Sequence, residues 1–335
     1  MQNLSETVRT NFPSKTVVIV GDLVADQFLH GTIARVSREA PVFILRHDAT
    51  DTLAGGAANA AVNVASLGGK TVLIGLAGND ANGGLLSDTL SRSGVDCAGV
   101  VSSDAIRTTT KVRVLAGQHY AARQQVIRID YENTGEIGSS LREKLWQNLI
   151  AAAESADAII ISDYNYGVAD HEIVERARQI SKRRNIPLII DSRFRLAEFP
   201  DAATATPNQE EVEQLLGKDF TVESCAALRE RLRLQALLVT RGNKGMLLLE
   251  KDREPFVVDA VGPVEPVDVT GAGDTVIAAY SLGLACGLGF RDAAVLANHA
   301  GGIVVMKKGT AVATAAELLN SLEENSLQII SESAA

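Results

Sequence analysis

Short, continuously apolar runs recur along this chain and alternate with longer stretches of helical pattern. The runs are TVVIVGD, TVLIGLAG, DAIIISD, IPLIIDS and ALLVTRG, at residues 16–22, 71–78, 157–163, 186–192 and 236–242. Helical patterns fill residues 57–67, 84–93, 139–155, 170–184, 222–233, 275–286 and 291–307. Apolar runs without polar alternation are typical of strands buried on both faces. The sequence therefore predicts an α/β fold, a doubly wound and mainly parallel sheet flanked by helices.

Two segments interrupt this alternation. Residues 31–46 and 109–130 alternate apolar and polar side chains with little helical pattern, as in KVRVLAG and QQVIRID. Such alternation is typical of antiparallel strands with one exposed face. We expect the two insertions to pair into a small β lid on a single domain of residues 15–322. Residues 1–14 and 323–335 are expected to be loose termini.

Charge and motifs exclude several classes of protein. The net charge is −9, from 32 basic and 41 acidic residues, whereas nucleic-acid binding needs a basic face. The first run ends in GDLVAD instead of GxGxxG, and no GxxxxGK[ST] string occurs, which argues against a Rossmann dehydrogenase and a Walker A ATPase. Residues 1–15 lack an apolar block, and the uncharged stretch 275–290 is shorter than the ~20 residues of a membrane span. We therefore expect a cytoplasmic protein.

The strongest candidate for chemistry is VDVTGAGDTVIAAYSLG, residues 267–283. The first amides of the predicted helix, from Gly271, Ala272 and Gly273, have no intrahelical partner and would bind an anion together with the helix dipole. Asp274 lies in the first turn, where a carboxylate can take a proton from an attacking hydroxyl. A bare GxGD is more often a glycine turn with a dipole-matching aspartate. The longer string DVTGAGD is far more specific.

DVTGAGD resembles the C-terminal signature of the ribokinase-like (PfkB) carbohydrate kinases, and GGAAN at residues 55–59 resembles their N-terminal signature. GDLVAD, TPNQEE and VTRGNKG follow in the family's order, so the resemblance covers about residues 17–314. Within the family, ARVSREAPVF, RTTTKVRVLAG and QVIRIDYEN are similar to the heptose 7-phosphate kinases. The resemblance implies a ribokinase-like fold and ATP-dependent phosphorylation of the anomeric hydroxyl of D-glycero-β-D-manno-heptose 7-phosphate, a step toward ADP-heptose and lipopolysaccharide.

The family's site residues carry over to matching positions of this chain. Asp274 would be the general base, and the amides of residues 271–273 would hold the transferring phosphoryl group. The nucleotide site would comprise Asn208, Glu211, Thr240, Gly242, Gly245 and Asn298. Glu211 would hold Mg²⁺ through water, and a monovalent cation is a further cofactor that the resemblance allows. PNQEE also fits a turn that caps the next helix, and both interpretations can hold together.

The sugar would bind at the end of the first strand. Asp22 and Asp26 are placed to accept hydrogen bonds from hydroxyls; two acids also suggest a metal, but no histidine or third acid accompanies them. The remaining sugar-side residues are Gly55, Gly56, Asn59, Lys111, Arg128, Asp130 and Asp163. The glycines allow close backbone approach, and Asn59 offers both a donor and an acceptor. Without the resemblance, charges on the inserted strands would read as solvated edge-strand residues.

One position departs from the heptose kinases. Tyr166, in SDYNYG, replaces a lysine that is a natural contact for substrate phosphate; Arg193, Arg195 or Arg123 could compensate. A PfkB kinase for another sugar, such as a fructose phosphate or ribose, is therefore an alternative, and an inactive sugar or nucleotide sensor is a more distant one. We further expect a homodimer through the lid and a separate nucleotidylyltransferase acting downstream.

Overall fold

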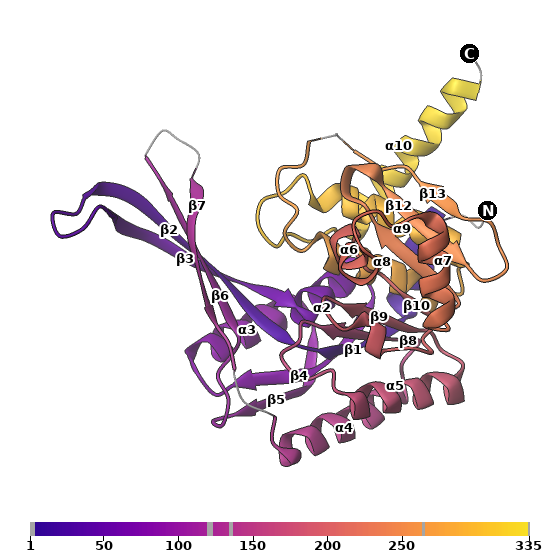
Figure 1. Ribbon diagram of the computed structural model, residues 1–335, viewed down its shortest axis with the longest axis horizontal. Coiled ribbons are helices and arrows are strands. Elements are labelled where there is room, and N and C mark those ends of the chain that lie inside the picture. Colours follow the sequence, from indigo (N-terminus) through magenta and orange to yellow (C-terminus); the bar gives the residue numbers. More distant parts are fainter. Residues whose placement is uncertain (1–3, 119–122, 134–136, 263–264, 334–335) are drawn as a thin grey trace.

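The computed structural model describes residues 4–118, 123–133, 137–262 and 265–333, and its centre is a nine-stranded sheet (Figure 1). The strand order is β13-β12-β11-β10-β9-β8-β1-β4-β5. The strands are β1 Thr16–Gly21, β4 Lys70–Gly78, β5 Asp96–Ser103, β8 Ala158–Asp163, β9 Leu188–Ser192, β10 Thr204–Ala205, β11 Ala236–Thr240, β12 Met246–Glu250 and β13 Phe256–Val258. Pairing is parallel from β5 to β11 and antiparallel for β12 and β13.

Helices cover both faces of this sheet. On β1, Val17 and Ile19 belong to one core cluster, and Val18 and Val20 belong to the other, as expected for a strand buried on both sides. The first cluster packs under α2 Ala57–Ser66, α3 Ala81–Arg92, α8 Ala272–Ala285, α9 Phe290–Val304 and α10 Ala315–Ser333. The second packs under α4 Ser139–Ala153, α5 His171–Arg184, α6 Gln209–Leu216 and α7 Val222–Arg231. The doubly wound α/β prediction is confirmed, and within the described ranges no helix is long and apolar enough to cross a membrane.

A second sheet of four strands projects from the body as an arm (Figure 1). Its order is β3-β2-β6-β7, with β2 Leu23–Val36, β3 Phe43–Gly56, β6 Thr110–Gly117 and β7 Gln124–Tyr131. We call this sheet the lid. Its base begins earlier than expected, because β2 starts two residues after β1 ends. The two insertions were expected to be antiparallel throughout; instead β2 pairs with β6 in parallel, and only the pairs β2–β3 and β6–β7 are antiparallel.

Residues 4–14, before β1, form ordered structure, which corrects the expectation of a loose segment there. They form three short turns of helix, α1 Leu4–Glu6, η1 Thr7–Asn11 and η2 Phe12–Ser14. Val8 and Phe12 are buried in the core because they are apolar and lie one turn apart. At the other end, α10 continues through residue 322 as a helix instead of ending there.

Candidate active site

A polar cavity of about 440 Å³ lies between the lid and the carboxyl ends of the parallel strands. Ligands of open α/β sheets bind at this edge. The lining residues are Lys111, Arg113, Arg128, Asp163, Tyr164, Asp191, Arg193, Phe194, Thr206, Asn208, Glu210, Glu211, Gln214, Thr240, Val269, Thr270, Gly271, Gly273 and Asp274. The cavity therefore brings lid cations to the same space as the GAGD turn.

Asp274 lies in the first turn of α8 and is 4% exposed. The amide of Asn59 donates to its Oδ2 at 2.7 Å, and the hydroxyl of Tyr164 donates to its Oδ1 at 2.9 Å. Burial raises the pKa of Asp274 to about 6, and the two donors act against that rise. The carboxylate is thus held in place and can still be ionised near neutral pH.

The turn before Asp274 depends on glycine. Gly271 has φ 77°, and a Cβ there would lie 2.6 Å from the Asn59 amide nitrogen, so a larger residue would displace Asn59 from the base. The N–H of Ala272 donates to the carbonyl of Val269. Among the described residues, the N–H groups of Gly271 and Gly273 have no acceptor. Of the three amides predicted to bind an anion, those of Gly271 and Gly273 are therefore the two that no described residue already engages.

A second cavity, of about 170 Å³, adjoins the first and shares Thr240, Val269 and Gly273 with it. Of the other residues predicted for the nucleotide, Gly242, Gly245 and Asn298 line it, together with Ala272 of the predicted anion hole, whereas Asn208 and Glu211 line the first cavity. Gly245 has φ 72°, and a Cβ there would collide with the carbonyl of Val258. The GAGD turn is the wall between the two cavities, which is where a phosphoryl group passing from one to the other would have to lie.

Asn208 and Glu211 form a capping box at the start of α6, with each side chain bonded to the other's backbone N–H at 2.9 Å. Both also line the larger cavity, so the capping role does not keep them away from it. Burial raises the pKa of Glu211 to about 7. Asp191, at the end of β9, has its pKa raised by burial and by the carboxylates of Glu211 and Asp274. Two carboxylates whose pKa values are raised in this way fit a hard divalent cation, because its charge would relieve their repulsion. No cluster of three candidate metal ligands occurs in the described residues, however.

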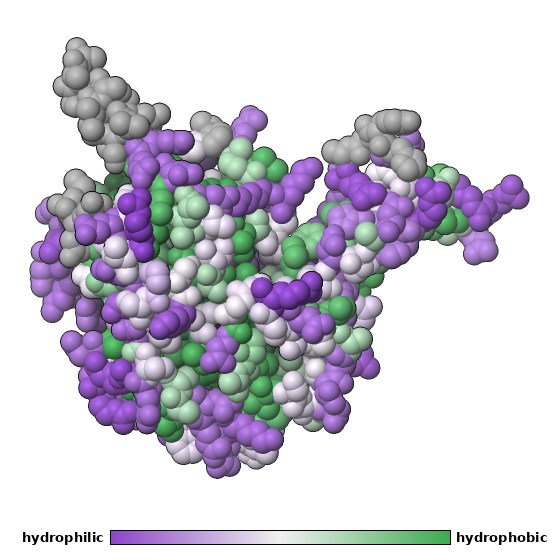
Figure 2. Space-filling model, turned by 180° about the vertical axis from the view of Figure 1, so that it is seen from behind, coloured by the Kyte–Doolittle hydropathy of each residue, from purple (hydrophilic) through white to green (hydrophobic). Residues whose placement is uncertain are grey.

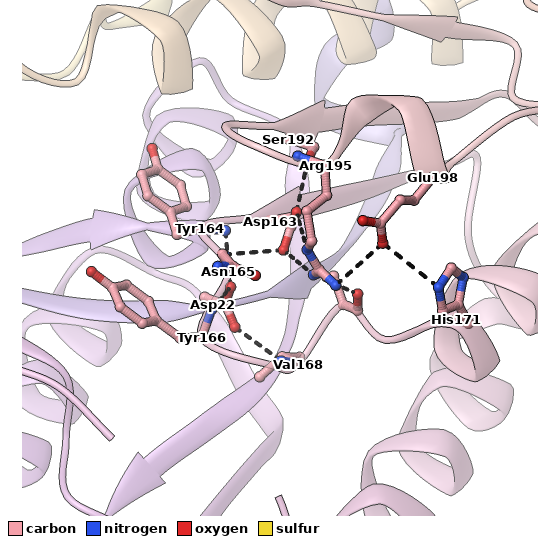
Figure 3. Close-up of polar contacts among 11 residues, drawn as sticks. Asp22, Asp163, Tyr164, Asn165, Tyr166, Val168, His171, Ser192, Arg195 and Glu198 are labelled. Atoms are coloured by element: carbon pink, nitrogen blue, oxygen red, sulfur yellow. Dashed lines mark hydrogen bonds and ion pairs between the residues drawn. The ribbon is translucent and has the colours of Figure 1, made fainter. Parts of the chain in front are cut away.

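Asp22 does not face the cavity, contrary to the sequence-based expectation. It is 1% exposed, and its carboxylate accepts hydrogen bonds from the backbone amides of Tyr164, Tyr166 and Val168, at 2.9 to 3.0 Å. Its side chain therefore holds the loop after β8 and is not available to a sugar hydroxyl. Figure 3 shows this loop, with both tyrosine rings pointing to the same side.

Asp163 lines the cavity, but its carboxylate is already engaged by protein groups. It accepts from the Ser192 hydroxyl at 2.6 Å, from the backbone N–H of Asn165 and from the Arg195 guanidinium (Figure 3). Asn165 lies in the loop after β8, Ser192 is the last residue of β9, and Arg195 follows β9. Asp163 thus ties the two segments together.

Asp26 lies at the base of the lid and pairs with Arg113 at 2.5 Å. Gly55 makes room for it, since a Cβ there would lie 2.7 Å from the Asp26 carboxylate. Gly56 has φ 58°, and a Cβ there would meet the Asp22 carbonyl at 2.6 Å. The two glycines are therefore explained by packing at the lid base.

Lys111 is a buried cation that lines the cavity. It is 8% exposed, and its ammonium lies 5.6 Å from the ring centroids of both Tyr164 and Tyr166. No described residue accepts a hydrogen bond from it or forms an ion pair with it. Burial lowers its pKa. A buried ammonium beside two tyrosine faces, with the Asp26 and Asp130 carboxylates near but not bonded to it, is placed to receive an anionic ligand.

The arginines at or near the cavity differ in whether their guanidinium groups already pair with a carboxylate. Arg128 is exposed on β7 and forms a two-bond pair with Asp130. Of the three arginines that could compensate for Tyr166, Arg195 binds Asp163 and Arg123 pairs with Asp48 in the lid. Only Arg193 lines the cavity. The Tyr166 hydroxyl itself donates to Glu132 at 2.7 Å, beyond the end of β7.

Tyr164, Asp191, Arg113 and Thr206 line the cavity without having been singled out from the sequence. Tyr164, Asp191 and Thr206 stand at or just beyond the ends of β8, β9 and β10. The rule that sites form at strand ends could have found these three. Arg113 could have been found in another way. It lies two residues from Lys111 on β6, and side chains two residues apart on a strand project from the same face.

Comparisons with known proteins agree with this geometry. A family model described as pfkB family carbohydrate kinase matches residues 15–316. Bifunctional protein HldE of Caulobacter vibrioides is 38% identical over 314 residues, which are 92% of this chain and 63% of that protein. Bifunctional protein HldE of Proteus mirabilis is 38% identical over 331 residues, 96% of this chain and 68% of that protein. The chain thus spans about two thirds of the length of these relatives.

Solved structures show the same fold. Ribokinase of Arabidopsis thaliana, complexed with ribose and ATP, has a TM-score of 0.70 at 22% identity, covering 92% of this chain and 98% of that one. Phosphofructokinase-2 of Escherichia coli, in complex with potassium, has a TM-score of 0.74 at 19% identity, covering 93% and 99%. The expected ribokinase-like architecture is confirmed.

Proposed function

Because the chain belongs to the pfkB family of carbohydrate kinases and is an ATP-dependent sugar kinase, we propose that its acceptor is a sugar phosphate, heptose 7-phosphate, phosphorylated at the anomeric hydroxyl. The observation that carries this proposal is the junction of the two cavities. Asp274 and the amides of Gly271 and Gly273 lie there, with the Lys111 ammonium in the larger cavity.

The reaction needs positioning and charge stabilisation more than covalent chemistry. Asp274 accepts the proton of the sugar hydroxyl while the hydroxyl oxygen forms a bond to the γ-phosphorus of ATP. The bond from that phosphorus to the bridging oxygen breaks, and ADP leaves. The amides of Gly271 and Gly273, at the N-terminus of α8, stabilise the charge on the moving phosphoryl group.

Mg²⁺ is part of the proposal. When bound, it would neutralise phosphate charge, and Glu211, through water, and Asp191 are the residues that would hold it. Both carboxylates line the cavity beside Asp274. A monovalent cation and a cytoplasmic location remain predictions from the sequence.

The phosphate of the acceptor would bind to Lys111 and Arg193. These cations line the cavity and come from different segments, the lid strand β6 and the loop after β9. Tyr166, in place of the lysine of the heptose kinases, contributes no cation, and Lys111 would bind the phosphate from the lid side. Relatives of this chain are bifunctional proteins; we propose that a nucleotidylyltransferase activity uses the product.

Substrate choice is tested by competition. With ATP and Mg²⁺, heptose 7-phosphate is expected to be turned over in preference to fructose 6-phosphate and ribose, and ³¹P NMR should show a new phosphate on O1. Ribose is the control for the phosphate subsite, because it presents nothing to Lys111. If fructose 6-phosphate or ribose is used far more efficiently, the heptose assignment is wrong while the kinase assignment stands.

We also propose that two copies pair through their lids. Strand β7 is an edge strand with every residue exposed, and Val126, Ile127 and Ile129 are 51%, 54% and 43% exposed. Figure 2 shows the arm standing away from the body, so that one body cannot cover it. A second lid would pair the free edge and bury its apolar side chains.

The double substitution Val126→Lys and Ile127→Lys is expected to produce monomers by light scattering at assay concentration and to raise KM for the sugar. The reason is that closed lids place Arg128 and Asp130 over the sugar and exclude water. Ile150→Lys, at an exposed apolar position on α4, is the matched control and should leave the dimer intact. A wild-type protein that is fully active as a monomer would contradict the proposal.

A further inference from the structure

The loop after β8 places a phenol directly against the base. The Tyr164 hydroxyl donates to Oδ1 of Asp274 at 2.9 Å, and Asn59 donates to Oδ2 at 2.7 Å. Each oxygen of the carboxylate therefore has a protein donor before any substrate arrives. The role inferred for this phenol rests on the proposed function of Asp274 as the base.

Tyr164 is itself held from two sides. Its backbone N–H, with those of Tyr166 and Val168, donates to the buried carboxylate of Asp22 (Figure 3). Its ring packs against the lid base, since a Cβ on Gly56 would lie 3.4 Å from the ring. Three bonds to one carboxylate fix the loop, and the absence of a side chain at residue 56 lets the ring approach.

We propose that Tyr164 is a positioning residue, whose hydroxyl orients the Asp274 carboxylate and keeps it in the charged form that can take a proton from the sugar. Asn59, on α2, orients the same carboxylate through its other oxygen. The phenol does not need to touch the transferring phosphoryl group for this role. The role also explains why Asp22 is buried beneath the loop instead of contacting the sugar.

The charges around Asp274 show why a donor is needed. Burial is the largest influence on its pKa and, with the Asp26 carboxylate on β2, raises it, to a net value of about 6. Asp191 on β9 is a third carboxylate close enough for repulsion. Against these act Asn59, Tyr164 and the Lys111 ammonium on β6. Burial and the nearby carboxylates raise the pKa of Tyr164 well above its usual range, so the phenol stays a donor across the working pH range.

The sign of the effect of Tyr164→Phe follows from these contacts. A hydrogen bond to the charged form of an acid lowers its pKa, so removing the hydroxyl raises the pKa of Asp274. The base is then protonated, and inactive, over a wider acidic range. The acid limb of the kcat/KM profile, expected near pH 6 in the wild type, should move to higher pH by about one unit.

The experiment measures kcat/KM for heptose 7-phosphate, or for the fastest sugar of the panel, between pH 5 and 9 at saturating ATP. Tyr164→Phe should be about fivefold below the wild type at pH 6, about tenfold below it at pH 5, and approach it at pH 8 to 9. Tyr166→Phe is the matched control, because its hydroxyl binds Glu132 and not Asp274. That variant should leave the acid limb where it is.

An acid limb that is unchanged or moves to lower pH in Tyr164→Phe overturns the proposal, even if kcat falls, because a merely structural role lowers activity at every pH. Thermal unfolding checks that the variant folds. Tyr164→Leu, which also lacks the hydroxyl, must shift the limb in the same direction if Tyr164→Phe is unstable. Full activity of Asp274→Asn would instead overturn the role of the base itself, so the two failures are distinguishable.

Discussion

Replacing Asp274 with asparagine is expected to lower kcat by ~10²–10⁴-fold while the sugar and ATP still bind. Asparagine keeps the size of the side chain and can still bond to Asn59 and Tyr164, but it cannot accept a proton from the sugar hydroxyl. The amides of Gly271 and Gly273 remain, so some phosphoryl transfer should persist. Steady-state kinetics with separate KM values for sugar and ATP measures the effect.

The matched control for this substitution is Asp88→Asn, which makes the same chemical change on the exposed face of α3. It should leave kcat unchanged. Near-wild-type turnover by Asp274→Asn, with normal sugar binding, would contradict the assignment of Asp274 as the base and leave the inactive-sensor alternative to be considered again.

Lys111→Met is expected to weaken the use of a sugar phosphate while making the fold more stable. Losing one partner of a buried charge pair costs ~2–5 kcal/mol, so KM for heptose 7-phosphate should rise about 10²-fold or more. The free energy of unfolding should rise by about 1 kcal/mol, because the folded protein no longer buries an ammonium without a partner. Kinetics and urea unfolding measure the two effects.

The gain in stability should depend on pH. Burial lowers the pKa of Lys111 from its ordinary 10.5, so the unfolded chain holds this proton more tightly than the folded protein does. The advantage of Lys111→Met should be full at neutral pH and shrink as the pH rises toward 10.5. Lys218→Met, at an exposed loop position, should change neither KM nor stability. A KM that rises equally for ribose would show that Lys111 does not bind the phosphate.

The buried parallel strands were the most predictable part of the fold. The five apolar runs became β1, β4, β8, β9 and β11 with small shifts at their ends, because a strand buried on both faces must be apolar throughout. Strand β10 has only two residues, too few for any periodicity. The parallel pairing of β2 with β6 was also beyond prediction, since alternation fixes which face is buried and not which strand is the neighbour.

The site was predictable where a local motif carries the geometry. Asp274, Gly271 and Glu211 belong to turns whose chemistry is set by a few adjacent residues, and all three line the cavity. Asp22 and Asp26 are four residues apart in one motif, yet the first binds backbone amides and the second pairs with Arg113. The two roles differ because Asp22 contacts the loop after β8 and Asp26 contacts the strand β6. Both of these elements are distant in sequence from the motif.

The ordered segment before β1 limits how far the chain can be shortened at its N-terminal end. The family match begins at residue 15, whereas Val8 and Phe12 already belong to the main core. A version trimmed to the family match would lack both side chains and leave a cavity in the core. Such a cavity lowers the free energy of unfolding. The smallest piece of this chain that folds well is therefore longer than residues 15–316, the piece that the family match defines.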